Sequence, residues 1–242
     1  MLKIVVPLVA RPQPRLGSPK QAFPWYLAEI SGEPLIEILV RGLVPAERHQ
    51  FVFVALESEI RRWALDDMFQ LIAPGSTTVS VEHHTAGDLC TVLLALDDHP
   101  RVSEILVATA APLLEIPVDR FLAHARKPGT DGCIASFRNT HPKWCYLREE
   151  DGEVVQVAQG RPVSDRATAG RFWFRSQNDL LEAAERQILK SLGADTTGLG
   201  VGPVFNEMIL MGRRIGSWGI EAGSSPQHES LAAEPKARHR AG

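Results

Sequence analysis

The chain has 242 residues, of which 44% are hydrophobic and 23% charged, and its formal net charge is -3. These values are ordinary for one large α/β domain or two small globular domains. The charge argues against nucleic-acid binding through a basic surface, and no apolar run reaches the ~20 residues that span a bilayer. Three widely spaced cysteines (Cys90, Cys133 and Cys145) and the lack of a recognisable secretion signal predict reduced thiols and a cytoplasmic protein.

Strand and helix patterns alternate through the first half of the chain. An apolar run over 4–9 predicts a buried strand, and a loop rich in proline and basic residues separates it from a helical pattern that begins within 24–37. The patterns that follow predict strands at 51–56, 77–81 and 104–108 and helices at 59–72 and 88–96. Alternating units of this length favour a mostly parallel sheet with helices on both faces.

The second half is richer in strands that follow one another directly. Strands are predicted at 131–138, 144–148, 154–158, 167–175 and 215–220, and helices at 178–192 and 204–211. Asp151-Gly152 predicts a hairpin turn, Asn178 is the expected N-cap of its helix, and Gly212 ends the last helix.

These patterns together predict an α/β fold, with a mostly parallel mixed sheet flanked by helices in a single domain. We expect the domain to cover 1–221, because no break along this part of the chain is clean enough to divide it. Residues 222–242 are rich in alanine, serine, proline and charge, a composition that favours a flexible C-terminal tail.

The loop after the first strand has the place of a phosphate-binding turn without its usual glycines. It reads Ala10-Arg11-Pro12-Gln13-Pro14-Arg15, and each proline lacks the backbone N–H that would hold a phosphate. The loop can instead present the side chains of Arg11, Arg15 and Lys20. The sequence is equally compatible with phosphate contact by these cations and with a solvated basic loop.

Five blocks of sequence carry the most specific pattern in the chain: residues 85–95, 131–132, 140–144, 162–170 and 203–209. In this order they resemble the nucleotidylyltransferases of the nucleotide-diphospho-sugar transferase (GT-A-like) fold, and most of all the capsule-biosynthesis and cytidylyltransferase-like branch. The resemblance covers residues 2–231. It implies a reaction that joins a nucleoside triphosphate to a phosphorylated acceptor and releases pyrophosphate, catalysed by positioning and electrostatic stabilisation.

The chain departs from this family at the positions where the family holds charge. Ala10 and Pro12 stand where glycines are expected, and Trp25 stands where a lysine neutralises developing charge. Magnesium is the cofactor that the resemblance implies, and Ala111 stands where its aspartate ligand belongs, so we expect no metal site there. Gln159-Gly160-Arg161-Pro162 replaces a Glu-Lys-Lys-Pro pattern and leaves one cation.

The resemblance also assigns candidate site residues. Those for the nucleotide or its phosphates are Val9, Ala10, Arg11, Arg15, Thr85, Gly87 and Asp88, and those for the acceptor are Lys143, Arg161, Thr168, Asn206 and Glu207. Among all of these, the catalytic candidates are Arg11, Arg15 and Lys143.

Several of these residues also have a structural explanation. Lys143 fits a surface lysine, and Asp88 fits a first-turn helix acid. Asn206 and Glu207 fit helix capping or packing, while the adjacent Asp165-Arg166 pair fits a local ion pair.

The aromatic and acidic residues near the site leave further alternatives. Trp25 and Tyr26 could stack on a base or contact a partner, although we favour a packing role in the space of the triphosphate. Glu115 and Glu221 could replace the missing metal ligand, but neither stands at the matching position.

These departures predict a catalytically degenerate nucleotidyltransferase-like protein that retains nucleotide or phosphate binding. It would bind a nucleoside triphosphate or a phosphorylated small molecule, and no nucleic acid. It would act as a regulatory partner, associating with itself or with an active transferase, in making nucleotide-activated sugars or related metabolites for surface polysaccharides such as capsule.

Two alternatives belong to other functional classes. The first is an active nucleotidylyltransferase with a rearranged site, whose charge is carried by Arg11, Arg15, Lys20, Lys143 and Arg161. The second is an interaction module with a filled pocket and an exposed apolar patch, for which the candidate anchors are Trp25, Tyr26 and Trp173.

Overall fold

A computed structural model describes residues 1–9, 24–96, 104–109, 114–192 and 199–220. The expectations for Ala10, Arg11, Arg15, Lys20, Ala111, Glu221 and the tail over 222–242 lie outside the described residues.

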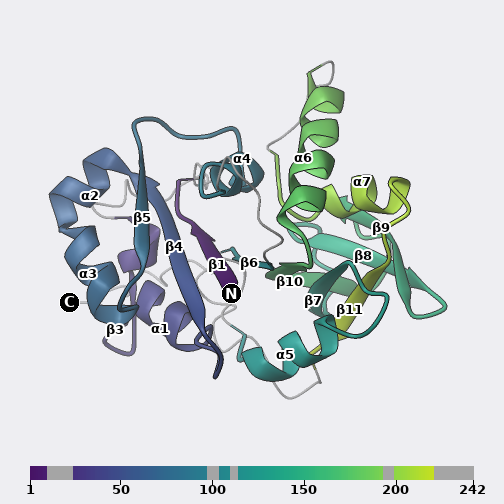
Figure 1. The fold of residues 1–242 in the computed structure, drawn as a ribbon, viewed down its shortest axis with the longest axis horizontal. Coiled ribbons are helices and arrows are strands. Elements are labelled where there is room, and N and C mark those ends of the chain that lie inside the picture. The colour runs from purple at the N-terminus through teal and green to yellow at the C-terminus, as the bar shows by residue number, and fades with distance from the viewer. Residues whose placement is uncertain (10–23, 97–103, 110–113, 193–198, 221–242) are drawn as a thin grey trace, which may run out of the picture.

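Within the described residues, a nine-stranded sheet forms the centre of the protein (Figure 1). Its main path runs in the order β11-β7-β10-β6-β1-β4-β5, and β8 and β9 extend it from β10. The strands are β1 Leu2–Pro7, β4 His49–Leu56, β5 Thr77–Val81, β6 Ile105–Ala108, β7 Gly132–Arg138, β8 Cys145–Glu150, β9 Glu153–Gln159, β10 Arg166–Phe174 and β11 Ile215–Gly219. Two short strands, β2 Glu29–Ile30 and β3 Glu33–Pro34, pair separately.

The strand directions confirm the predicted mixed, mostly parallel sheet. β5, β4, β1 and β6 pair in parallel. β10 runs antiparallel between β6 and β7, and β11 is parallel to β7. The hairpin predicted at Asp151-Gly152 joins β8 to β9, and both turn residues have positive φ, 50° and 82°, as a tight two-residue hairpin turn requires.

Helices cover both faces of the sheet, and each face has its own apolar core. α1 Leu35–Arg41, α2 Glu57–Trp63, α3 Leu65–Ile72 and α5 Val118–Ala125 pack on one face, and α4 Asp88–Leu93, α6 Gln177–Ser191 and α7 Val204–Leu210 pack on the other. In β1, Ile4 and Val6 join the first core and Val5 joins the second. Figure 1 shows α1 to α3 beside β4 and β5, and α6 and α7 beside the β8–β9 end.

The helix predicted over 59–72 is wrong as a single element, because α2 ends and α3 begins around Ala64. This residue has a left-handed backbone conformation, with φ 49° and ψ 46°. Ile60 before the break and Leu65 and Phe69 after it are all buried in the same apolar core. The apolar spacing therefore continues from α2 into α3, and for this reason the spacing alone does not show that the helix breaks at Ala64.

Two further helix expectations differ from the structure in their bounds. The helical pattern that begins within 24–37 becomes a helix only at Leu35, since Trp25–Leu27 form a short 3-10 turn (η1) and β2 and β3 intervene. The N-cap of α6 is Ser176 and not Asn178, because the Ser176 hydroxyl accepts from the Asp179 backbone N–H at 3.5 Å. α5 was not predicted, although Val118, Phe121, Leu122 and Ala125 have helical spacing and are buried.

The carboxyl ends of β1, β4, β5 and β6 meet at one edge of the sheet, because these strands are parallel. This is the edge where ligands bind in open α/β sheets. Val9 follows β1, Thr109 follows β6, and α4 begins shortly after β5. None of the helices in the described ranges has both the length and the apolar character needed to cross a membrane.

We expect Ala64→Gly to stabilise the protein by up to about 1 kcal/mol, because glycine adopts the left-handed conformation without a steric cost. The matched control is Ala123→Gly at an exposed position inside α5, which should destabilise by about 0.5–1 kcal/mol through lost helix propensity. Urea unfolding of both variants measures the difference. A loss of stability in both would contradict the assigned helix break.

Candidate functional site

The segment between β5 and α4 brings the predicted nucleotide-binding residues to the end of β1. The ring Nδ1 of His84 lies 2.8 Å from the carbonyl oxygen of Val9. The Thr85 hydroxyl donates to the Gly87 carbonyl at 3.0 Å and lies 2.6 Å from the Thr91 hydroxyl. The described candidates Val9, Thr85, Gly87 and Asp88 therefore belong to one local structure at the carboxyl edge of the sheet.

Gly87 is required by a close approach of two backbones. Leu89 donates its N–H to the carbonyl of Leu199 at 2.9 Å, and Leu199 donates to Ala86 at 3.2 Å. A Cβ at position 87 would lie 2.4 Å from the Leu199 carbonyl oxygen. This pairing joins the start of α4 to the chain just before α7. The close approach of the two backbones is a sufficient structural reason for glycine at position 87. Its role toward a nucleotide stays a prediction.

Asp88 is the first residue of α4 and is partly buried. Burial raises the pKa of its carboxyl to about 6. A helix N-terminus favours a negative charge, but here the loss of hydration outweighs that effect. The site therefore holds a carboxyl group that gains or loses its proton close to neutral pH.

Asn206 is held by the outer strand of the sheet. Its Oδ1 accepts from the Val157 N–H at 2.8 Å, and its Nδ2 donates to the Val157 carbonyl at 2.8 Å. The amide thus forms the pair of hydrogen bonds with β9 that a neighbouring strand would form. This role is structural, but it is not the helix capping considered above.

The other buried acceptor candidates also have protein partners. Both carboxylate oxygens of Glu207 lie 2.7 Å from Nζ of Lys190, so this pair joins α7 to α6. Thr168 is buried and forms a side-chain hydrogen bond with Cys145. The described geometry therefore gives Asn206, Glu207 and Thr168 structural roles, and an acceptor-binding role stays a prediction.

The basic acceptor candidates lie at the surface. Lys143 and Arg161 are exposed, and Nζ of Lys143 lies 4.6 Å from the ring centre of Trp144. The predicted ion pair between Asp165 and Arg166 is wrong, because each residue pairs elsewhere. Asp165 pairs with Arg138 at 2.5 Å, and Arg166 pairs with Glu149 at 3.4 Å.

Trp25 and Tyr26 form part of the core on the α1 face. Tyr26 is buried, and its hydroxyl donates to Glu59 at 2.8 Å. Trp25 meets the Tyr26 ring edge-on at 5.4 Å and packs against the same core. Trp173 is also fully buried. Tyr26 and Trp173 are therefore excluded as exposed anchors of a partner surface.

Arg171 of β10, which lies beside the end of β6, was not predicted as a site residue. It pairs with Ala108 across β10 and β6, and only 4% of its surface is exposed. Its Nη1 donates to the carbonyl oxygens of Thr109 at 3.1 Å and Gly170 at 3.3 Å. The signal in the sequence is a single cation between Gly170 and the aromatic run Phe172–Phe174, inside the strand predicted at 167–175.

The described residues at the end of β6 do not fit the magnesium ion that the resemblance implies. The Thr109 carbonyl accepts from Arg171, and a buried guanidinium repels a divalent cation. In the described ranges, no group of three or more His, Cys, Asp and Glu side chains is placed to hold a metal ion. Glu115, considered above as a replacement ligand, is exposed.

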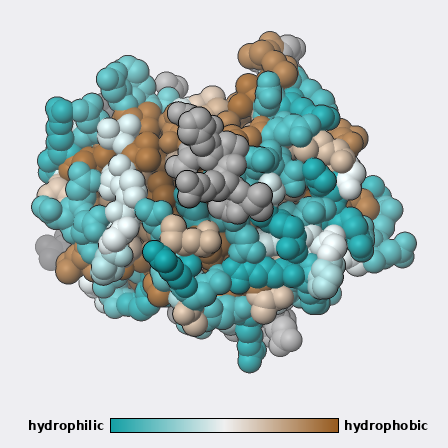
Figure 2. All heavy atoms as spheres, viewed as in Figure 1, coloured by the Kyte–Doolittle hydropathy of each residue, from teal (hydrophilic) through white to brown (hydrophobic). Residues whose placement is uncertain are grey.

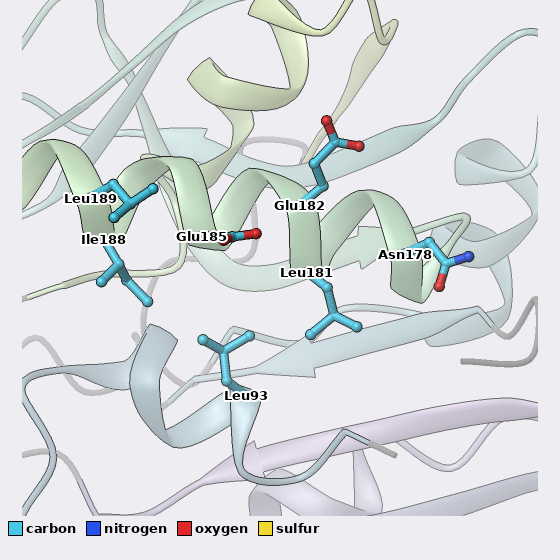
Figure 3. A pocket seen from close by; sticks show the side chains of 7 residues that line it. All are labelled: Leu93, Asn178, Leu181, Glu182, Glu185, Ile188 and Leu189. Atoms are coloured by element: carbon cyan, nitrogen blue, oxygen red, sulfur yellow. The ribbon is translucent and has the colours of Figure 1, made fainter. Parts of the chain in front are cut away.

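An apolar groove of about 550 Å³ lies between α4 and α6. Leu181 and Ile188 of α6 point toward Leu93 of α4, and Glu182 and Glu185 also line it (Figure 3). None of the described candidate site residues lines the groove. Figure 2 shows mostly hydrophilic residues over this face of the molecule and hydrophobic ones at the far end of α6, where Leu189 and Leu192 are exposed.

Solved structures share this fold over most of the chain. A nucleoside-diphosphate-sugar pyrophosphorylase from Vibrio cholerae RC9 has a TM-score of 0.75 and 21% identity, over 91% of this chain and 93% of its own. The inositol-1-phosphate CTP transferase from T. maritima has a TM-score of 0.67 and 14% identity, over 90% and 84%. A UDP-glucose pyrophosphorylase in complex with UDP-glucose has a TM-score of 0.69 and 16% identity, over 90% and 89%.

No protein-family model and no curated protein matches the sequence. The structural likeness confirms the predicted fold, which this chain shares with these two pyrophosphorylases and this CTP transferase.

We expect Asp88→Asn to change how stability depends on pH. The folded-state pKa of about 6 exceeds the unfolded value of about 3.9, so the wild type binds more protons when folded and loses stability as pH rises from about 4 through 6. The amide of the variant cannot ionise, so the variant should gain relative stability across this range. Thermal unfolding from pH 4 to 7.5 measures it, with Asp66→Asn in the first turn of α3 as the exposed control. Parallel curves for wild type and Asp88→Asn would contradict the shifted pKa.

We expect Asn206→Ala to destabilise the protein by about 1–3 kcal/mol, because it leaves the Val157 N–H and carbonyl without their partner. Asn178→Ala, at an exposed position in α6, should change stability by no more than about 0.5 kcal/mol. Urea unfolding measures both variants. Equal stabilities would show that water replaces the Asn206 amide.

Proposed function

We propose that the protein is a nucleotidyltransferase-like protein that binds a nucleotide or a phosphorylated small molecule and transfers nucleotides weakly or not at all. The observation that carries the proposal is the buried Arg171 at the end of β6, where it bonds the Thr109 carbonyl. In the family that the sequence resembles, this strand end holds an aspartate and magnesium. A fixed cation supports phosphate binding and opposes metal binding at the same place.

The contacts of the acceptor candidates support weak transfer. The Asn206 amide is hydrogen-bonded to the backbone of Val157, and the Glu207 carboxylate is paired with Lys190. Trp25, at the position of the expected lysine, packs against the core. Loss of one preorganised electrostatic group typically slows an enzyme by ~10²–10³, and several such groups differ here. Their effects are not additive.

The nucleotide side supports retained binding. Polar groups beside the end of β1 are held in place by hydrogen bonds. His84 contacts the Val9 carbonyl, and the Thr85 hydroxyl contacts Gly87 and Thr91. We therefore place a nucleoside triphosphate or a nucleotide-sugar beside α4. The related pyrophosphorylases and the CTP transferase support a role in making nucleotide-activated sugars or other phosphorylated metabolites.

We further propose a cytoplasmic role as a regulatory partner in that synthesis, with surface polysaccharides such as capsule as the destination. The protein would act either as a homo-oligomer or with an active transferase. Co-purification with transferases encoded in the same cells, followed by activity measurement of the complex, tests this part separately.

A pyrophosphate-release assay tests the proposed lack of transfer. The four common ribonucleoside triphosphates and thymidine triphosphate are each combined with magnesium and a panel of sugar and inositol phosphates. We expect release at background, while at least one nucleotide raises the melting temperature, since a ligand that binds the folded state stabilises it.

Turnover would favour the alternative of an active transferase with a rearranged site. In that case Lys143→Met and Arg161→Met should abolish release, and Arg148→Met on the exposed side of β8 should not. Turnover that depends on Lys143 or Arg161 would replace the proposed degenerate protein with an enzyme.

A further inference from the structure

Arg171 is a buried cation with few partners. Of its three guanidinium nitrogens, Nη1 donates to two backbone carbonyls. Among the described residues, no acceptor lies within hydrogen-bond distance of Nε or Nη2, and no carboxylate pairs with the side chain. A guanidinium has five N–H donors, so most of its hydrogen-bonding capacity is unused.

Such an arrangement is costly for the protein alone. A charge removed from water requires a counter-charge or a full set of hydrogen bonds. Burial lowers the pKa of Arg171 to about 10, so the group is still a cation at neutral pH. Two carbonyl dipoles compensate only part of the lost hydration. A bound anion with several oxygens would supply both the counter-charge and the missing acceptors.

The position of Arg171 matches the place where such an anion would bind. The residue is paired with Ala108, the last residue of β6, and reaches the carbonyl of Thr109 one residue further along. β6 is the direct neighbour of β1, with Val107 beside Val5. The guanidinium therefore lies at the carboxyl edge of the parallel strands, where ligands of such sheets bind.

We propose that Arg171 binds the phosphate or diphosphate group of the ligand through its Nε and Nη2 donors. It supplies as a fixed side chain the positive charge that the magnesium ion is expected to supply in the family. This inference rests on the proposed function for the identity of the ligand, but the anion site itself stands on the contacts of Arg171. Because the cation is part of the chain, binding needs no divalent metal.

Calorimetry and thermal unfolding with inorganic pyrophosphate, in buffer with a chelator, test the inference. We expect the wild type to bind pyrophosphate without a metal. Arg171→Met keeps the length of the side chain and removes its charge, and it should weaken binding by roughly 10-fold to 100-fold, the range for hydrogen bonds to charged groups. Without pyrophosphate its melting temperature should equal or exceed that of the wild type, because an unpaired buried charge is gone.

Two further variants complete the experiment. Arg171→Lys keeps the charge with fewer donors, so it should bind pyrophosphate with intermediate affinity, and it carries the test if Arg171→Met does not fold. Arg186→Met removes an exposed cation of α6 and should leave binding unchanged. Equal affinity in wild type and Arg171→Met, or no pyrophosphate binding by the wild type, would overturn the inference.

The outcomes also separate this inference from the proposed function. Pyrophosphate binding that requires Arg171, without binding of any nucleotide or sugar phosphate, would refute the proposed function and leave the anion site in place. Nucleotide binding that does not change in Arg171→Met would refute the anion site and leave the proposed function in place.

Discussion

The complete burial of β1 between two parallel partners is the constraint on which this structure depends. All six residues of β1 are buried, and the strand pairs with β4 on one side and β6 on the other. A strand in this position needs apolar side chains on both faces, and its neighbours must end at the same edge. The polar groups that follow β1, β5 and β6 are therefore brought together although they are far apart in the sequence.

The Asn206 and Glu207 side chains have partners within the protein, whereas Arg171 has few. Glu207 is neutralised by Lys190, and the Asn206 amide is used by β9. Arg171 is buried beside Thr109 without a counter-ion among the described residues. The Asn206 and Glu207 side chains thus bond other elements of the fold, while Nε and Nη2 of Arg171 have no hydrogen-bond acceptor among the described residues. In the function that we propose, this arrangement suits the binding of an anion more than the transfer of a phosphoryl group.

Sequence patterns predicted the sheet well because burial on two faces leaves continuous apolar runs, as in β1 and β4, and β5 has the predicted bounds. The predictions failed where a feature depends on the conformation of one residue or on a partner from another element. The break at Ala64 depends on one backbone conformation, and the N-cap at Ser176 on one hydroxyl. The partners of Asn206 and Glu207 come from other elements, β9 and α6, which the pattern within α7 does not indicate. Arg171 was missed because its importance comes from the strands on either side, which a linear pattern does not contain.

The bond between Asn206 and Val157 has a consequence for how copies of this protein can meet. An outer strand with free backbone groups is a template for the addition of another chain and for aggregation. The outer edge of β9 is closed at Val157, since both of its backbone groups are already taken by one side chain of α7. Backbone pairing of β9 with a strand of another molecule is therefore blocked at Val157, and a partner strand would first have to displace the Asn206 amide.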